Sequence, residues 1–190
     1  REKKNVNYGL SGLLTGSGGH ADFAIETGTF RYATPEERRP FFQAGIARLQ
    51  ASLGAAGVSY GQNEAAINQV IEARERLSFA DDQQRESLSR LVQATGDLSR
   101  ATELQAIAMD LARGKGMDLV SASELIGKVA NGNVGILKRY GISLADGATA
   151  TEALAEVTRL AGGQARAYAD TDLGKVEAAI KVGSCVKILR

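Results

Sequence analysis

A chain of 190 residues has room for one domain, and its core must come mainly from Ala, Leu, Val and Ile because aromatic residues make up only 5% and Trp is absent. A formal net charge of +1 without a clustered basic stripe argues against a nucleic-acid site. One cysteine, Cys185, excludes an internal disulfide, and the absence of any apolar run of about 18 residues predicts no transmembrane span.

Residues 1–34 are dominated by glycine, serine and threonine. The chain begins at Arg1 and no continuous apolar stretch follows, so we expect a fragment or a processed product without a signal peptide. Some aromatic and apolar residues alternate in a way that short strands use: Phe23, Ile25, Phe30 and Tyr32. We therefore expect an irregular, Gly-rich N-terminal extension that has room for short strands.

Residues 35–190 carry the signals of a helical domain, and the sharpest helix start is the run from Thr34 to Glu37. Thr34 can cap this helix and proline suits its first position, whereas Pro40 is expected to kink or delay it. Apolar residues then recur at helical spacing before the glycines at 54–57: Phe42, Ile46, Leu49 and Leu53. A second helix is predicted from Gln62 to Leu77.

The later helices are marked by polar caps at their starts and by glycine at their ends. We predict them from Asp81 or Asp82 to Gly96, from Asp97 to Gly116, from the capping box Ser121–Glu124 to Gly132, as a short turn from Asn133 to Tyr140, from the capping box Thr149–Glu152 to Gly162, and from Gln164 as far as Ile188. The prediction is an all-α fold, a compact array of short to medium helices joined by glycine turns.

Two sets of residues make this prediction testable. The first set should lie within two residues of helix ends: Gly96, Gly114, Gly132, Gly141 and Gly162. The second set forms apolar stripes on successive helices and should be the core: Leu98, Leu104, Leu111, Leu125, Ile126, Val129, Leu137, Leu154 and Val157. Leu160 and, in the last helix, Val176 follow the same spacing.

No catalytic, cofactor or metal site is predicted. The loop Gly16–His20 lacks the spacing and the lysine of a phosphate cradle, so we interpret it as a flexible loop around the only histidine. The paired acids Asp81-Asp82 and Asp170 with Asp172 fit helix starts and solvated faces. Cys185 fits an apolar helix face, and Arg113 with Lys115 fits a helix C-terminus, where cations offset carbonyl dipoles.

The stretch from Leu91 to Ala178 carries four motifs in a fixed order. They are a Thr-Gly-Asp turn (95–97), A-x-D-L-A-x-G-x-G-x-D-L (108–119), G-K-V-A-N-G-N-x-G-x-L-K-R-Y-G-I (127–142) and G-Q-A-x-A-x-A-x-T-x-x-G-K (163–175). In this order they resemble the tail tape measure proteins of long-tailed bacteriophages and prophages. The stretch covers roughly half of the chain, while residues 1–45 match no pattern of that family and the part after Ala178 departs from it.

The resemblance implies a central helical module of a structural virion protein that occupies the tail-tube lumen and sets tail length, and it brings no catalytic residues. It also implies assembly in the bacterial host cytoplasm and, as partners, the tail-tube protein, tail assembly chaperones and tail-tip proteins. Self-association into a homo-oligomer is compatible with it. A second class of protein stays open, a helical binding module of a secreted or host-interacting protein that holds a partner helix in an apolar groove. A peptidoglycan hydrolase is the third alternative, and the sequence shows no catalytic Glu/Asp or Cys/His motif for it.

Overall fold

The computed structural model describes residues 35–185, with side-chain detail for residues 43–178, and all regular structure in these residues is helical. The elements are α2 (Pro35–Ala55), α3 (Tyr60–Glu75), α4 (Asp81–Thr95), α5 (Leu98–Lys115), α6 (Leu119–Ala130), the 3-10 helix η1 (Val134–Tyr140), α7 (Ala150–Ala161), α8 (Gln164–Ala169) and α9 (Asp172–Cys185). The predicted all-α fold is confirmed. Thr34 and the irregular segment before it lie outside the described residues.

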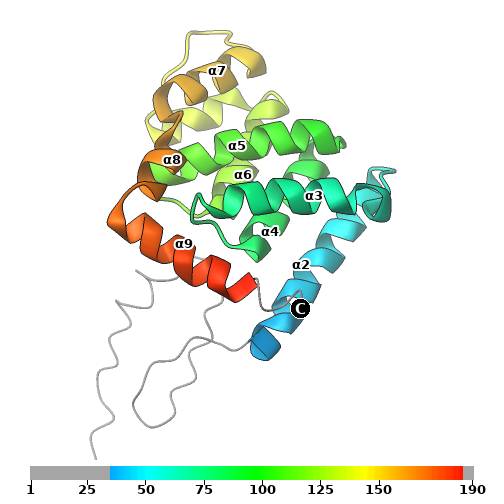
Figure 1. Ribbon diagram of the computed structural model, residues 1–190. Coiled ribbons are helices and arrows are strands. Elements are labelled where there is room, and N and C mark those ends of the chain that lie inside the picture. Colours follow the sequence, from blue (N-terminus) through cyan, green and yellow to red (C-terminus); the bar gives the residue numbers. More distant parts are fainter. Residues whose placement is uncertain (1–34, 186–190) are drawn as a thin grey trace, which may run out of the picture.

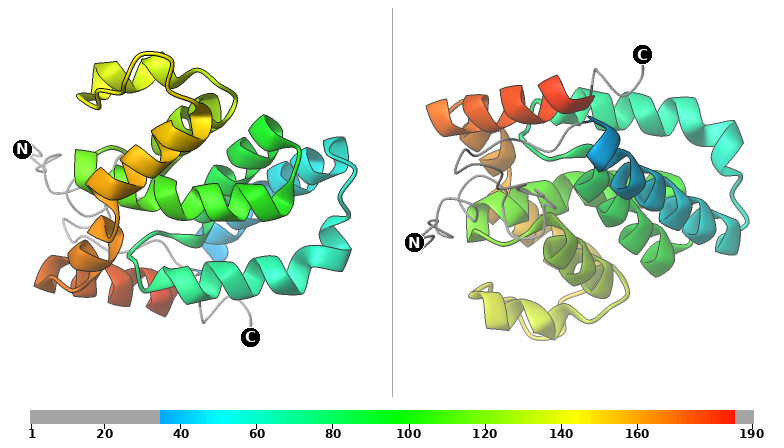
Figure 2. Two further views of the ribbon diagram at one scale, coloured as in Figure 1. Left: turned by 90° about the horizontal axis from the view of Figure 1, so that it is seen from above. Right: turned by 90° about the horizontal axis from the view of Figure 1, so that it is seen from below.

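The helices are arranged around α4, which packs against both α2 and α6 (Figure 1). α5 packs across α4 and α6, and it also carries α7 and α8. α9 packs against α8 and reaches the end of α3, so it lies at the edge of the array rather than inside it (Figure 2). Helices that follow one another in the chain are thus often neighbours in space, as the short glycine turns require.

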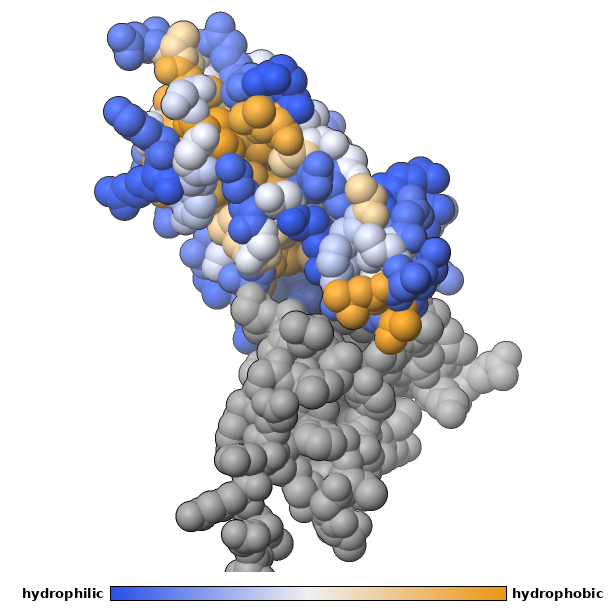
Figure 3. Space-filling view, turned by 90° about the vertical axis from the view of Figure 1, so that its left-hand side faces the viewer, coloured by the Kyte–Doolittle hydropathy of each residue, from blue (hydrophilic) through white to orange (hydrophobic). Residues whose placement is uncertain are grey.

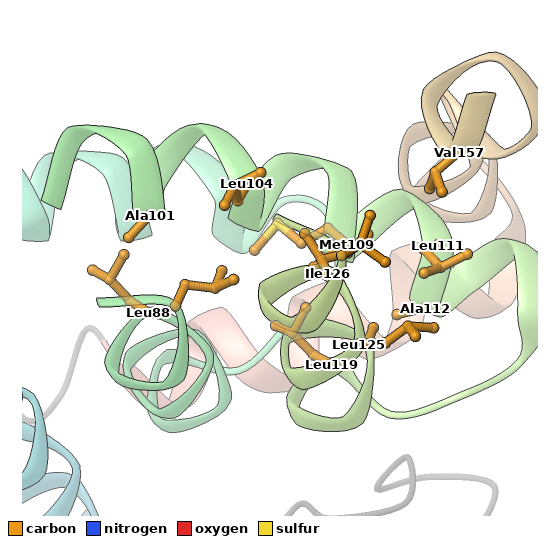
Figure 4. Packing of buried hydrophobic residues seen from close by; sticks show 14 of the residues in the cluster. Leu88, Ala101, Leu104, Met109, Leu111, Ala112, Leu119, Leu125, Ile126 and Val157 are labelled. Carbon is orange, nitrogen blue, oxygen red and sulfur yellow. The ribbon is translucent and has the colours of Figure 1, made fainter. Parts of the chain in front are cut away.

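The apolar stripes meet in one core, where Leu88 of α4, Leu104 of α5 and Ile126 of α6 point into the same interior (Figure 4). The predicted core is confirmed for every residue named above except Leu98, which is half-buried. The prediction is wrong for Leu160, which is 46% exposed, because α7 turns Ala161 inward instead.

Helix ends follow the predicted polar caps and glycines closely. Thr149 caps α7, since its Oγ1 accepts the Glu152 N–H at 3.3 Å while the Glu152 Oε2 accepts the Thr149 N–H at 2.8 Å. Gly96, Gly116 and Gly141 stand at helix C-termini in the left-handed conformation, with φ of 67°, 64° and 74°. Glycine takes this conformation without a Cβ clash. All five glycines predicted to mark helix ends lie within two residues of one.

Two of the predicted helix starts are wrong. α6 begins before the Ser121–Glu124 pair, because the Oδ1 of Asp118 accepts the Ser121 N–H at 2.8 Å and so starts the helix at Leu119. At α4 the N-cap is Ala80, not Asp81 or Asp82, because the Asp81 carboxylate binds Arg85. The Gln83 Oε1 supplies a cap there by accepting the Ala80 N–H at 3.3 Å.

Two long helices also differ from prediction. α2 is continuous from Pro35 to Ala55, so Pro40 does not delay its start. The predicted last helix is split into α8 and α9 by a turn at Asp170 and Thr171. Thr171 starts the second part, since its Oγ1 accepts the Gly174 N–H at 3.0 Å and thereby caps α9.

Small and hydroxyl-bearing residues let α4 approach its neighbours. The Ser52 hydroxyl of α2 lies 2.7 Å from that of Ser89, and Ser87 lies 2.7 Å from Ser123 of α6. All four serines are buried, so the hydrogen bond within each pair replaces the hydrogen bonds that these hydroxyls would make to water. Gly127 of α6 completes the α4–α6 contact, because a Cβ at that position would lie 2.9 Å from the Ala94 Cβ.

Candidate functional site

The residues weighed as candidates in the sequence do not converge on one place. The Gly16–His20 loop lies outside the described residues, and so does the side chain of Cys185, whose backbone ends α9. Asp170 and Asp172 are exposed at the turn between α8 and α9, as a solvated pair should be. Within residues 35–185, no group of three or more His, Cys, Asp or Glu side chains is arranged to hold a metal ion.

Asp81 has a different environment from the predicted one, because it is buried in an ion pair. Its two carboxylate oxygens accept hydrogen bonds from Arg85 Nε at 2.6 Å and Nη2 at 3.1 Å. Arg85 also donates to the Tyr60 hydroxyl at 3.2 Å and to the Asn68 side-chain oxygen at 2.7 Å, so it ties α3 to α4. Burial raises the pKa of the Asp81 carboxyl, and the hydrogen bonds and charge of Arg85 oppose that shift.

A second buried network joins α3, α4 and α5 through neutral amides. The Gln105 Nε2 donates to the Gln84 carbonyl at 2.7 Å and to the Ser87 hydroxyl at 3.2 Å, while its Oε1 accepts from Arg74 at 2.6 Å. Gln105 and Gln84 have no exposed surface. The Gln105 side chain makes its hydrogen bonds inside the protein, so this network fixes how the three helices face one another and offers no open site for a ligand.

The most unusual side-chain cluster is built around Arg113, near the C-terminus of α5. Its guanidinium carbon lies 4.5 Å from the Phe79 ring centroid and 3.9 Å from the Tyr168 ring centroid, so the cation stacks on two aromatic faces. Its Nη2 donates to the Ser78 carbonyl at 2.7 Å and lies 3.5 Å from the Glu177 Oε2. We call Ser78, Phe79, Arg113, Tyr168 and Glu177 the Arg113 cluster.

The Arg113 cluster corrects the sequence interpretation of Arg113 as a cation that only offsets a helix dipole. Its partners come from the α3–α4 turn, from α8 and from α9, and they are separated from it by 35, 55 and 64 positions in the chain at Ser78, Tyr168 and Glu177. No local pattern could have indicated them, because cation–aromatic stacking leaves no periodic trace in a sequence. Lys115, two residues later, is exposed as predicted.

Two polar groups of the Arg113 cluster have an environment set by burial. Tyr168 donates its hydroxyl proton to the Glu177 Oε1 at 2.9 Å, and only 4% of Glu177 is exposed. Burial raises the pKa of the Tyr168 hydroxyl, and the hydrogen bond to Glu177 raises it further because it requires the neutral phenol. The arrangement keeps the tyrosine protonated and the carboxylate paired, which suits a structural clamp better than proton transfer.

The hollows on the described surface are shallow. One lies over α4 and α6 beside Arg90, Glu124 and Lys128, and another follows the loop 143–148 beside Glu152 and Glu156. Arg90 and Glu124 of the first hollow, 3.7 Å apart, end a line of alternating charges in which Arg48 binds Glu86 at 3.0 Å and Glu86 binds Arg90 at 3.0 Å. Neither hollow gathers the convergent groups of a reaction site.

Apolar side chains are exposed on the outer helices instead. Leu160 of α7 and Leu173 and Val176 of α9 are 46%, 41% and 51% exposed. The space-filling view of the side that carries α7, α8 and α9 shows apolar residues among polar ones (Figure 3). Val176 follows the apolar spacing of the predicted last helix, yet it lies outside because α9 turns Glu177 toward the protein.

No helix within residues 35–185 is both long and apolar enough to cross a membrane. Comparison of the chain with protein-family models, with curated proteins and with solved structures finds no match.

Proposed function

We propose that this chain is a central helical module of a tail tape measure protein, a structural component of a long-tailed bacteriophage or prophage. The observation that carries the proposal is the order of four motifs between Leu91 and Ala178. Their glycines have a physical role, since Gly96, Gly116, Gly132 and Gly141 all take positive φ at or next to helix ends. The motifs therefore encode the ends of packed helices and need no ligand to explain them.

The proposed site of action is the tail-tube lumen of the virion, reached after assembly in the bacterial host cytoplasm. The proposed partners are the tail-tube protein, tail assembly chaperones and tail-tip proteins. A helix extends about 1.5 Å per residue, whereas the turns at Gly96, Gly116 and Gly141 fold this chain back on itself. A compact module cannot measure the tail while it is folded, so its proposed role includes unfolding when the tail contents leave.

We also propose that the module has no enzymatic activity. The support is chemical: the sequence holds one histidine and one cysteine, and the buried acids Asp81 and Glu177 are each bound to an arginine. A carboxylate whose oxygens already accept hydrogen bonds from a guanidinium inside the protein is not placed to take a proton from a substrate, as a general base must. Muramidase and amidase assays on the purified chain should give no turnover, and turnover that depends on His20 would contradict the proposal.

The alternative function is a helical binding module of a secreted or host-interacting protein. The observation that favours it is the exposure of Leu160, Leu173 and Val176 on outer helices, since apolar side chains on a surface can receive a partner. The neighbourhood of the gene separates the two functions. Genes for tail-tube and tail-chaperone proteins beside it favour the tape measure, and genes of a secretion system favour the binding module.

A direct test uses the phage or prophage that carries the gene. Mass spectrometry of purified tails should find peptides of this chain, and in-frame deletion of residues 35–185 should shorten the tails seen by electron microscopy. The shortening should not exceed about 1.5 Å per deleted residue, the rise of a helix. Tails of the unmodified phage that lack these peptides would rule the proposal out. An in-frame deletion elsewhere in the same gene, of equal length, serves as the control.

A further inference from the structure

The first two turns of α9, whose side chains the structure describes, are attached to the rest of the protein by polar contacts rather than by apolar burial. Among its described side chains, Leu173 and Val176 are 41% and 51% exposed, whereas Glu177 is only 4% exposed. Gly174 is also buried. This is the reverse of an ordinary amphipathic helix, so the hydrophobic effect contributes little to holding the first two turns of α9 in place.

The contacts that do hold α9 converge on the Arg113 cluster. Glu177 binds Arg113 and Tyr168, and the Gly174 carbonyl accepts the Ser78 hydroxyl at 2.7 Å. Ser78 itself has a φ of 63°, a left-handed conformation that non-glycine residues rarely adopt. The same residue accepts a hydrogen bond from Arg113 at its carbonyl, so Arg113 and α9 stabilise this turn from two sides.

The backbone at the start of α9 packs closely against the backbone at the end of α8. A Cβ added at Gly174 would lie 2.1 Å from the Tyr168 carbonyl oxygen and 2.8 Å from the Ala169 Cα. Both are backbone atoms and cannot turn aside as the end of a flexible side chain could. α8, by contrast, is fixed to α5, because Ala165 is buried and its N–H donates to Asp110 Oδ1 at 2.9 Å. The hinge of any movement of α9 is therefore the turn at Asp170 and Thr171.

We propose that α9 is a strap that opens at this turn without unfolding of α4, α5 and α6, and that Arg113 is the latch that holds it closed. Removal of the guanidinium would take from the buried Glu177 carboxylate its ion pair with Arg113. Loss of an ion pair by a buried carboxylate is costly, and that cost falls when α9 leaves and returns Glu177 to water.

Amide hydrogen exchange of the full chain tests the strap. In the unmodified protein, α9 amides beyond the first turn should exchange at least about tenfold faster than those of α4 and α6, because local opening bypasses global unfolding. Arg113→Met should speed exchange in α9 by about a further tenfold while α4 and α6 change by less than about twofold. Arg159→Met is the matched control, since it removes an exposed guanidinium that binds Glu156 at 2.7 Å, and it should change neither region.

A second variant keeps the test sharp if Arg113→Met does not fold. Gly174→Ala changes no residue of the Arg113 cluster, and alanine in place of glycine ordinarily stabilises a helix. Here it should instead speed exchange in α9 selectively, because the added Cβ would clash with the Tyr168 carbonyl oxygen. Slower exchange in Gly174→Ala would overturn the proposal. So would equal protection of α9 and α4 in the unmodified protein, or an equal loss of protection in all helices of Arg113→Met.

Discussion

Leu125 shows how much of the stability of this protein rests on single aliphatic side chains. It lies on the buried face of α6 with 2% of its surface exposed. Leu125→Ala should lower the free energy of unfolding by about 2–5 kcal/mol, because it removes apolar contact and leaves a cavity. Chemical denaturation followed by circular dichroism measures this. Leu160→Ala is the control, and its effect should be small because Leu160 is 46% exposed. Equal midpoints for the two variants would contradict the burial of Leu125.

Two helical glycines should respond to alanine with opposite signs. Gly54 in α2 has open space where a Cβ would stand, so Gly54→Ala should stabilise the protein by about 0.5–1 kcal/mol through lower backbone entropy of the unfolded chain. Gly127→Ala should instead destabilise the protein, because its Cβ would lie 2.9 Å from the Ala94 Cβ. Thermal melting of both variants measures the difference, and Ala94→Gly should restore the stability of Gly127→Ala. Stabilisation by Gly127→Ala alone would show that α4 and α6 can separate freely.

At the scale of the helix, the start of α7 links a cap to pH. The hydrogen bonds from the Thr149 backbone and side chain lower the pKa of the Glu152 carboxyl. A carboxyl whose folded pKa is depressed contributes stability at neutral pH, and that contribution is lost as the pH falls through the folded value. Thr149→Ala should cost about 1 kcal/mol. As the pH is lowered, the melting temperature of Glu152→Gln should fall less than that of the unmodified protein. An equal fall in the two proteins would exclude this cap as a source of the pH dependence.

Helix ends could be predicted well because a cap or a glycine acts on its own neighbours. Thr149 and Gly96 need only the next few residues to do so, and the structure confirms both. The errors arise where two local signals compete, as at Asp118 and Ser121, and the earlier cap starts the helix. The burial of Arg85 and the stacking of Arg113 could not be predicted, because their partners come from other helices and no spacing encodes them. For the same reason, the proposed role of Arg113 in holding α9 could not be predicted from the sequence.

At the scale of the whole molecule, the composition of the core indicates modest stability. Within residues 43–178, seven buried positions are alanine, which contributes little apolar area: Ala101, Ala108, Ala112, Ala122, Ala153, Ala161 and Ala165. Glycine accounts for 22 of 190 residues, and each glycine held in order loses more backbone entropy than alanine would. A module that must pass through a narrow tube would also be hindered by high stability.

We therefore expect a free energy of unfolding at or below the low end of the roughly 5–15 kcal/mol that is usual for domains. Guanidinium denaturation monitored by circular dichroism measures it on the full chain. A midpoint above about 5 M, the mark of a hyperstable protein, would contradict the expectation and weaken the proposal that the module unfolds in use.

The hydrogen bond between Ser78 and Gly174, which holds α9, also has a consequence for the order of folding. The serine pairs that join α4 to α2 and to α6 connect residues 37 and 36 positions apart, whereas Ser78 and Gly174 are 96 positions apart. The entropy lost on closing a loop grows with its length, and contacts between nearby segments form fastest. Refolding should therefore assemble α2, α4 and α6 early and close the Ser78–Gly174 contact last. The final step of folding and the first step of opening are then the same movement, made in opposite directions by α9.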